Sequence, residues 1–146
     1  MATFCDFVIA TETAQFAQPE IKLGCFPPVA MITLPQLVGV RTAMDLLLTG
    51  RTVPAAEAKS LGLVTRIVPD ALLDKAVRDF LAELRALSPA VLKLTGRSLR
   101  RRQHADFESD LSKVEQIYLG QLMKTEDAKE GIRAFLEKRP ASWRGR

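Results

Sequence analysis

The chain has 146 residues, of which 47% are hydrophobic and 26% are charged, and its formal net charge is +4. These proportions are ordinary for a globular domain with a packed core, and they exclude a disordered tail. No stretch approaches the roughly 18 uninterrupted apolar residues of a membrane helix, and no secretion signal follows Met1. We therefore expect a cytoplasmic protein with no membrane partner.

The N-terminal half predicts short strands that alternate with helices. Residues 4–10 form an apolar run interrupted by Asp6, which is typical of a strand buried on both faces of a parallel sheet. A buried carboxylate needs a partner, so Asp6 should be hydrogen-bonded to the backbone or to a neighbouring helix start. Further elements are expected as strands at 14–17 and 63–68 and as helices at 29–37, 41–49 and 54–60, the first kinked or in two pieces at Pro35.

The C-terminal half is predicted to be helical. Apolar residues recur at helical spacing over 70–87, Ser88 and Pro89 are typical of a helix start, and further helices are expected over 105–123 and after a Thr125 cap. These helices carry more apolar surface than a small domain covers, which indicates burial against a partner subunit. The fold class is therefore α/β and mostly helical, with a few short strands.

The cysteines and the histidine offer no metal or triad chemistry. Cys5 and Cys25 have no His or Cys neighbour at ligand spacing, so we expect buried, reduced thiols and no metal. His104 stands alone and is predicted to be structural or exposed.

Glu20 is the best catalytic candidate in the chain. It lies in a turn fixed by Pro19, between Phe16 and Phe26, and a carboxylate in apolar surroundings is suited to exchanging a proton with a substrate. The alternative is a turn carboxylate that caps a helix or pairs with Lys22.

Several segments, in order along nearly the whole chain, resemble the enoyl-CoA hydratase/isomerase family of the crotonase superfamily. The segments that carry the resemblance are Cys5-Asp6-Phe7-Val8-Ile9-Ala10, Phe16-Ala17-Gln18-Pro19-Glu20-Ile21-Lys22-Leu23-Gly24, Ala58-Lys59-Ser60-Leu61-Gly62-Leu63-Val64 and Thr125-Glu126-Asp127-Ala128-Lys129-Glu130-Gly131. The resemblance implies the C-terminal part of a crotonase-like ββα spiral, with the spiral core at 1–69 and a helical oligomerisation region at 70–146. It also implies a homo-oligomer, either a trimer or a dimer of trimers.

The family resemblance also implies a reaction. Its members add water to a 2-enoyl-CoA thioester or isomerise it, the residue matching Glu20 acts as an acid/base, and coenzyme A enters as part of the substrate without a further cofactor. Hydrolases share the scaffold. The resemblance further places Phe135 and Lys138, expected on one face of the last helix, against the adenine and phosphates of CoA; the alternative is a core Phe with a solvated Lys.

Two departures from the family pattern matter. The oxyanion-hole donors and the second glutamate lie upstream of Cys5-Asp6 in the family, where this chain has four residues, so the 146-residue chain alone is expected to be inactive. The second departure is that Phe26 and Pro27 stand in a connector that is glycine-rich in the family, which resembles the branch acting on cyclic dienoyl-CoA thioesters in aromatic degradation. Drift in a connector is the alternative for this segment.

Two other classes of function remain open at this point. One is a non-catalytic oligomerisation or CoA-binding remnant of the family. The other is a nucleic-acid binder that uses Arg97, Arg100, Arg101 and Arg102, although no aromatic residues interleave with them. We expect no nucleic-acid partner, because a solvated helix end or a subunit contact explains the arginines equally well.

Overall fold

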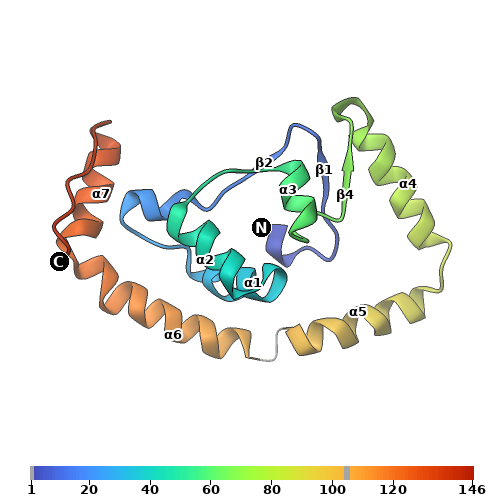
Figure 1. Cartoon of the computed structure of the whole chain (residues 1–146). Helices are drawn as coiled ribbons and strands as arrows, with labels where there is room; N and C mark the ends of the chain where they lie inside the picture. The colour runs from blue at the N-terminus through green and yellow to red at the C-terminus, as the bar shows by residue number, and fades with distance from the viewer. Residues whose placement is uncertain (1, 104–105) are drawn as a thin grey trace. The chain divides into compact units, whose positions relative to one another are not determined.

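The computed structural model describes residues 2–103 and 106–146, and for residues 102 and 103 only the backbone is described. His104 and the side chain of Arg102 therefore lie outside the described part. The elements, coloured along the chain in Figure 1, are η1 Ala2–Phe4, β1 Ile9–Thr11, β2 Gln15–Phe16, η2 Pro19–Leu23, α1 Pro28–Val38, α2 Val40–Thr49, β3 Val53–Pro54, α3 Ala55–Ser60, β4 Arg66–Val68, η3 Asp70–Leu72, α4 Leu73–Arg85, α5 Pro89–Gln103, α6 Phe107–Gly120, η4 Leu122–Lys124 and α7 Glu126–Leu136.

Two compact units make up the chain, the first from Met1–Phe16 and Val53–Phe107 and the second from Ala17–Thr52 and Glu108–Arg146. The predicted division between a spiral core at 1–69 and an oligomerisation region at 70–146 concerns assembly, and it stays a prediction.

The first unit contains two pairs of short strands. β1 pairs with β4 in parallel, with Ala10 opposite Ile67, and β2 pairs with β3 in antiparallel fashion. The parallel pairing is as predicted, but a strand buried on both faces over 4–10 was expected, whereas β1 is only three residues long and residues 4–7 are exposed. The backbone of Val8 donates instead to the Thr65 hydroxyl at 3.0 Å, so the apolar run meets its neighbour mainly at its end.

Two expectations for this unit are wrong. Cys5 is exposed rather than buried. Asp6 is also exposed, and its carboxylate accepts hydrogen bonds from the Arg100 guanidinium at 2.6 and 2.8 Å instead of capping a backbone segment. The pair joins positions far apart in the sequence, which explains why the local pattern did not indicate it.

The core of the second unit lies where α1 and α2 pack against each other. Their buried faces carry Ala30, Ile32 and Leu34 from α1 and Ala43, Leu46 and Leu47 from α2. Pro35 lies inside α1, which continues from Pro28 to Val38 as a single helix rather than two pieces. Residues 24–27 connect the η2 turn, which carries Glu20, to the first turn of this helix.

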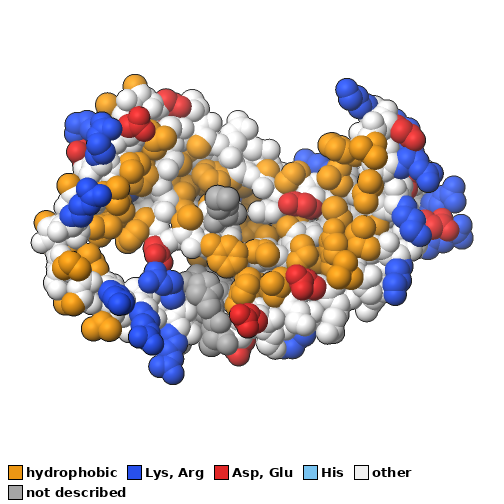
Figure 2. Space-filling model, turned by 180° about the vertical axis from the view of Figure 1, so that it is seen from behind, with side chains coloured by type: hydrophobic (Ala, Val, Ile, Leu, Met, Phe, Trp, Pro, Cys, Tyr) orange, Lys and Arg blue, Asp and Glu red, His pale blue; other side chains and the backbone are white. Residues whose placement is uncertain are grey.

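The helices α4 to α6 leave many apolar side chains exposed. Val91, Leu94 and Leu99 of α5 are 62%, 61% and 69% exposed, and Ile117 and Leu119 of α6 are 49% and 65% exposed. Figure 2 shows exposed hydrophobic side chains of this kind in orange. The surplus of apolar surface that the sequence predicts is thus present.

Candidate functional site

Glu20 lies in the short helical turn η2, Pro19–Leu23. Pro19 begins the turn, where its missing N–H and fixed φ cost nothing, and Gly24 ends it with a left-handed φ of 71°. The Gly24 N–H donates to the Ile21 carbonyl at 3.1 Å. The sequence Pro-Glu-x-x-x-Gly therefore encodes a tight turn that fixes the backbone of Glu20 from both sides.

The carboxylate of Glu20 has an unusual environment. Its Oε2 atom is buried and has no hydrogen-bond partner among the described residues. Lys22, two residues along, is exposed, and no described ion pair joins it to Glu20. A buried acceptor without a partner is costly and uncommon, and the pairing with Lys22 that was the alternative is not seen among the described residues.

Cys25 and Phe26 form the wall that follows Glu20. The Cys25 backbone N–H and its thiol both donate to the Glu20 carbonyl, at 3.2 and 3.4 Å. The Phe26 ring meets Tyr118 of α6 edge-on, with centroids 5.2 Å apart and an interplanar angle of 80°. A cavity of about 230 Å³ opens beside this wall, lined by Ile21, Gly24, Cys25, Phe26, Leu122, Asp127 and Trp143.

The Cys25 thiol and the neighbouring Tyr118 phenol both have raised pKa values. Burial raises the pKa of the Cys25 thiol; a hydrogen bond with Tyr118 lowers that pKa and the Glu20 charge raises it. Burial, then the neighbouring Cys25 and then the Glu20 charge raise the pKa of the Tyr118 phenol. Both groups are therefore held in their neutral forms at neutral pH.

Helix α7 packs directly on the η2 turn. A Cβ at Gly131 would lie 2.2 Å from the Leu23 carbonyl oxygen, so only a residue without a side chain permits this approach. At Gly24, a Cβ would lie 2.8 Å from the Asp127 carbonyl oxygen and 3.1 Å from the Trp143 ring. The turn that carries Glu20 is thus held against α7 by backbone contacts.

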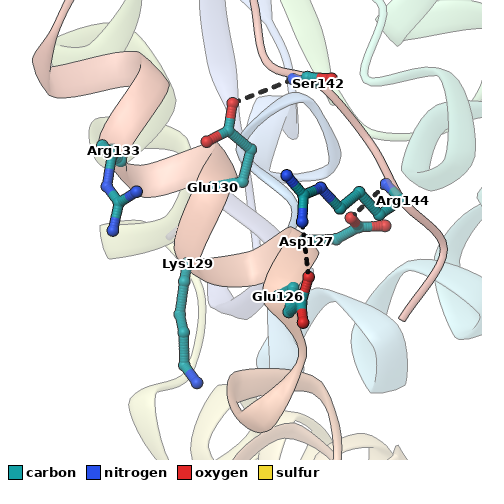
Figure 3. Close-up of a pocket in the computed structure, with 7 residues that line it drawn as sticks. All are labelled: Glu126, Asp127, Lys129, Glu130, Arg133, Ser142 and Arg144. Carbon is teal, nitrogen blue, oxygen red and sulfur yellow. Dashed lines mark hydrogen bonds and ion pairs between the residues drawn. The ribbon is translucent and has the colours of Figure 1, made fainter.

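The C-terminal strap (residues 140–146) runs back along α7. Its Ser142 N–H donates to Glu130 at 3.1 Å, and the N–H groups of Arg144 and Gly145 donate to the Asp127 carboxylate at 2.6 and 2.8 Å. Figure 3 shows these side chains around a cavity of about 350 Å³ lined by Glu126, Asp127, Lys129, Glu130, Arg133, Ser142 and Arg144. Because Glu130 and Asp127 in its lining accept hydrogen bonds from the strap, we interpret this cavity as part of the packing between the strap and α7.

The other predicted site residues lie in two places. Phe26 and Pro27 follow the Glu20 turn, and Pro27 precedes the first residue of α1. Phe135 lies near the end of α7 and is 64% exposed. Lys138 lies beyond the end of α7 in a left-handed conformation, φ 51°, so the expectation that it shares a helix face with Phe135 is wrong. Phe135 is therefore not part of the core formed by the described residues.

Sequence reasoning missed Cys25, Tyr118 and Trp143 as neighbours of the Glu20 turn. Tyr118 and Trp143 are the single tyrosine and the single tryptophan of the chain. A hydroxyl between Ile117 and Leu119, in a helix with an apolar face, is a signal that could have pointed to a buried polar contact.

The described part of the chain offers neither a metal centre nor a membrane span. Among residues 2–103 and 106–146, no group of His, Cys, Asp and Glu side chains is placed to hold a metal ion. In the same described ranges, every helix is too short or too polar to cross a membrane.

The structure is similar to solved structures of the crotonase fold. An enoyl-CoA hydratase/isomerase from Pseudoalteromonas atlantica superposes with a TM-score of 0.87 at 30% identity, covering 98% of this chain and 58% of its own. A methylmalonyl CoA decarboxylase superposes at 0.85 with 22% identity and shares the fold alone. The crotonase-like fold implied by the sequence is confirmed.

The chain belongs to the enoyl-CoA hydratase/isomerase family, whose model matches residues 1–146. A probable enoyl-CoA hydratase of Mycobacterium bovis is 41% identical over 146 residues, covering 95% of this chain and 54% of the relative. A cyclohexa-1,5-dienecarbonyl-CoA hydratase of Thauera aromatica is 39% identical over 141 residues, covering 97% and 54%. The chain thus spans about half the length of the relatives it matches.

Proposed function

We propose that Glu20 is the acid/base of a hydratase reaction on a 2-enoyl-CoA thioester. The observation that carries this proposal is the buried Oε2 of Glu20, which has no partner among the described residues. In the reaction, the water oxygen bonds to C3 of the enoyl group and a proton is delivered to C2. A carboxylate whose acceptor is held free of protein donors is suited to bind that water and transfer its proton.

The family membership supports an acyl-CoA thioester as substrate and no cofactor beyond the CoA that the substrate carries. Isomerisation of the same substrate needs the same proton transfer, so it is the alternative within the family. A non-catalytic CoA-binding or oligomerisation role is the alternative from another class. The two classes differ in whether Glu20 influences turnover.

A chimera tests the role of Glu20. This chain would be joined to the N-terminal segment of the Mycobacterium bovis relative, and hydration of crotonyl-CoA would be followed by loss of thioester absorbance. Glu20→Gln keeps the size of the side chain but removes the acid/base, so kcat should fall by roughly 10²-fold or more. The control is Glu115→Gln, an exposed glutamate of α6, which should leave kcat unchanged. An unaltered kcat in the Glu20 variant would refute the assignment.

Comparison of the chimera with the chain alone separates the catalytic proposal from the remnant. The family resemblance places the oxyanion donors in the N-terminal segment that the chimera supplies. Deleting one such donor from a comparable site costs on the order of 10² to 10³ in rate. We therefore expect no measurable hydration by the 146-residue chain, and full activity in the chimera. If the chimera binds CoA thioesters but is inactive while the relative itself is active, the remnant is the better description.

We further propose a cyclic dienoyl-CoA as the preferred substrate. The support is the Phe26-Pro27 wall next to Glu20 and the 39% identity to the Thauera aromatica hydratase. A rigid, apolar wall without glycines favours a flat ring over a flexible chain. In the chimera, Phe26→Ala should lower kcat/KM for cyclohexa-1,5-diene-1-carbonyl-CoA more than for crotonyl-CoA. Equal losses for both substrates would contradict the specificity.

A further inference from the structure

The C-terminal strap is bonded to the first turn of α7. The N–H groups of Glu126 and Asp127, which have no partner inside the helix, donate to the Arg146 carbonyl at 2.8 and 3.2 Å. In the opposite direction, the N–H groups of Arg144 and Gly145 donate to the two Asp127 carboxylate oxygens at 2.6 and 2.8 Å. Hydrogen bonds to a charged acceptor are stronger than neutral ones, so Asp127 is the main anchor of this end of the strap.

The anchored strap places Trp143 on the turn that carries Glu20. A Cβ at Gly24, which ends the turn, would lie 3.1 Å from the Trp143 ring. The same Cβ would lie 2.8 Å from the Asp127 carbonyl oxygen. Asp127 therefore contacts the turn through its backbone and holds the strap through its side chain.

Trp143 also lines the cavity of about 230 Å³ beside the turn, together with Cys25 and Phe26. It is 49% exposed, so one part of the side chain faces solvent while another faces the turn. Cys25 is bonded twice to the Glu20 carbonyl, through its backbone N–H and through its thiol. Displacement of Trp143 would therefore both free the end of the turn and uncover Cys25.

We propose that Trp143 is a positioning residue of the Glu20 site and that Asp127 is the anchor that holds it there. Its ring packs on Gly24 and fixes the end of the turn from which the carboxylate extends. The position matters because a general acid/base must stay within hydrogen-bond reach of the proton that it transfers. The catalytic meaning of this role rests on the proposed function of Glu20, but the contact of the strap with the turn does not.

Alkylation of Cys25 by iodoacetamide at fixed pH, in the 146-residue chain, reports whether the strap covers the cavity. Mass spectrometry would follow the Cys25 peptide, with the exposed Cys5 as internal control. Asp127→Asn leaves one oxygen to accept where two N–H groups donate, so alkylation of Cys25 should be faster by roughly fivefold, the effect of one ordinary hydrogen bond. Trp143→Ala removes the cover itself and should speed alkylation at least as much. The Cys5 rate should not change in either variant.

Asp110→Asn is the matched control for Asp127→Asn. Asp110 lies in the first turn of α6, as Asp127 lies in the first turn of α7, and it pairs with Lys113 at 3.0 Å. Both substitutions remove an acid from the start of a helix, but of the two acids only Asp127 binds the strap in the described structure. An equal rise of Cys25 alkylation in the two variants, or no rise in Trp143→Ala, would overturn the proposal.

The fluorescence of Trp143 reports on the strap directly, because this residue is the single tryptophan of the chain. Release of the strap exposes more of the ring to water. The emission of Asp127→Asn should therefore lie at longer wavelength than that of wild type, and the emission of Asp110→Asn should not shift. Unchanged emission in Asp127→Asn would contradict its role as the anchor.

Kinetics in the chimera separate positioning from simple cover. Trp143→Ala should lower kcat for crotonyl-CoA severalfold at an unchanged KM, and Trp143→Phe, which keeps a flat ring, should restore most of the loss. A loss confined to KM, or an unchanged kcat in a variant whose Cys25 is uncovered, would contradict the positioning role. Failure of the proposed function has a different signature, because Glu20→Gln would then leave kcat unchanged while Trp143→Ala still speeds alkylation of Cys25.

Discussion

The η2 turn and helix α5 obtain their packing from different sources. The turn is held by neighbours within the chain. Gly131 allows α7 to pack closely on the Leu23 carbonyl, and Gly24 allows the Trp143 ring to lie close to the turn. Helix α5 has few such neighbours, and Leu94 and Leu99 are 61% and 69% exposed. The difference teaches that the turn carrying Glu20 is packed by residues of this chain, while the apolar side chains of α5 stay exposed among the described residues.

The largest expected effect is at Gly131. A Cβ there would meet the Leu23 carbonyl at 2.2 Å, and a backbone atom cannot move aside as a flexible side chain can. Gly131→Ala should therefore lower the free energy of unfolding by about 3 kcal/mol, in the range of overpacked sites. The measurement is urea unfolding followed by circular dichroism.

Gly120→Ala is the matched control for this substitution. Gly120 ends α6, and a Cβ there would meet nothing within 4 Å. Stability should stay the same or rise by up to about 1 kcal/mol, because alanine favours the helix. Equal effects of the two substitutions would show that α7 does not press on the Glu20 turn.

The next prediction concerns the exposed face of α5. We expect the chain to form a trimer or a dimer of trimers, in which this face is covered. Leu94→Asp would place a charge in the covered surface and should weaken association by about 2 kcal/mol or more. Multi-angle light scattering at micromolar concentration should show the loss of the oligomer.

Thr95→Asp, at the adjacent exposed position of α5, is the matched control for association. It introduces the same charge on a different side of the helix and should leave the oligomer intact. A wild-type chain that is monomeric at these concentrations would contradict the oligomer itself.

A smaller effect is expected at Thr125, the cap of α7. Its hydroxyl accepts from the Ala128 N–H at 3.0 Å. Thr125→Ala should cost about 1 kcal/mol of unfolding free energy, and Thr125→Ser, which keeps the hydroxyl, should cost much less. Because α7 supports the η2 turn, Cys25 should also become more accessible to alkylation in the alanine variant.

Sequence patterns predicted the features that depend on interactions between neighbouring residues. The Thr125 cap, the start of α5 at Pro89 and the end of α2 at Thr49 all depend on a few neighbouring residues, and the structure confirms each of them. The turn at Pro19–Leu23 that carries Glu20 is equally local, and the role of Glu20 stays a proposal. The strand expected over 4–10 shortened to Ile9–Thr11 because strand length depends on the partner β4.

The remaining features depend on distant residues. The Asp6–Arg100 pair joins positions 94 apart in the sequence, and Tyr118 meets Phe26 across a similar separation. No pattern in one segment indicates such contacts, although a lone tyrosine among apolar residues marks a place to look. Lys138 was misplaced because α7 ends at Leu136, before the pattern suggested.

The smallest expected effect is the pH dependence of the strap. Hydrogen bonds from Arg139, and then from the Ser142 N–H, lower the pKa of Glu130 from 4.5 to about 2. A group whose pKa is depressed in the folded state stabilises that state above its unfolded pKa, and the stabilisation is lost as pH falls toward the folded pKa. The contribution of Glu130 should therefore be complete above about pH 5 and mostly gone at pH 2.5.

Comparison of Glu130→Gln with wild type isolates this contribution. The variant should have a lower Tm at pH 6, and the difference from wild type should shrink as pH falls from 4.5 toward 2. The difference should be small even at pH 6, because the Arg139 side chain is 37% exposed and water screens the pair. Glu115→Gln, on α6, should show no such convergence. A Tm difference for Glu130→Gln that is independent of pH would mean that the strap is held by its backbone contacts to Asp127 rather than by the Glu130–Arg139 pair.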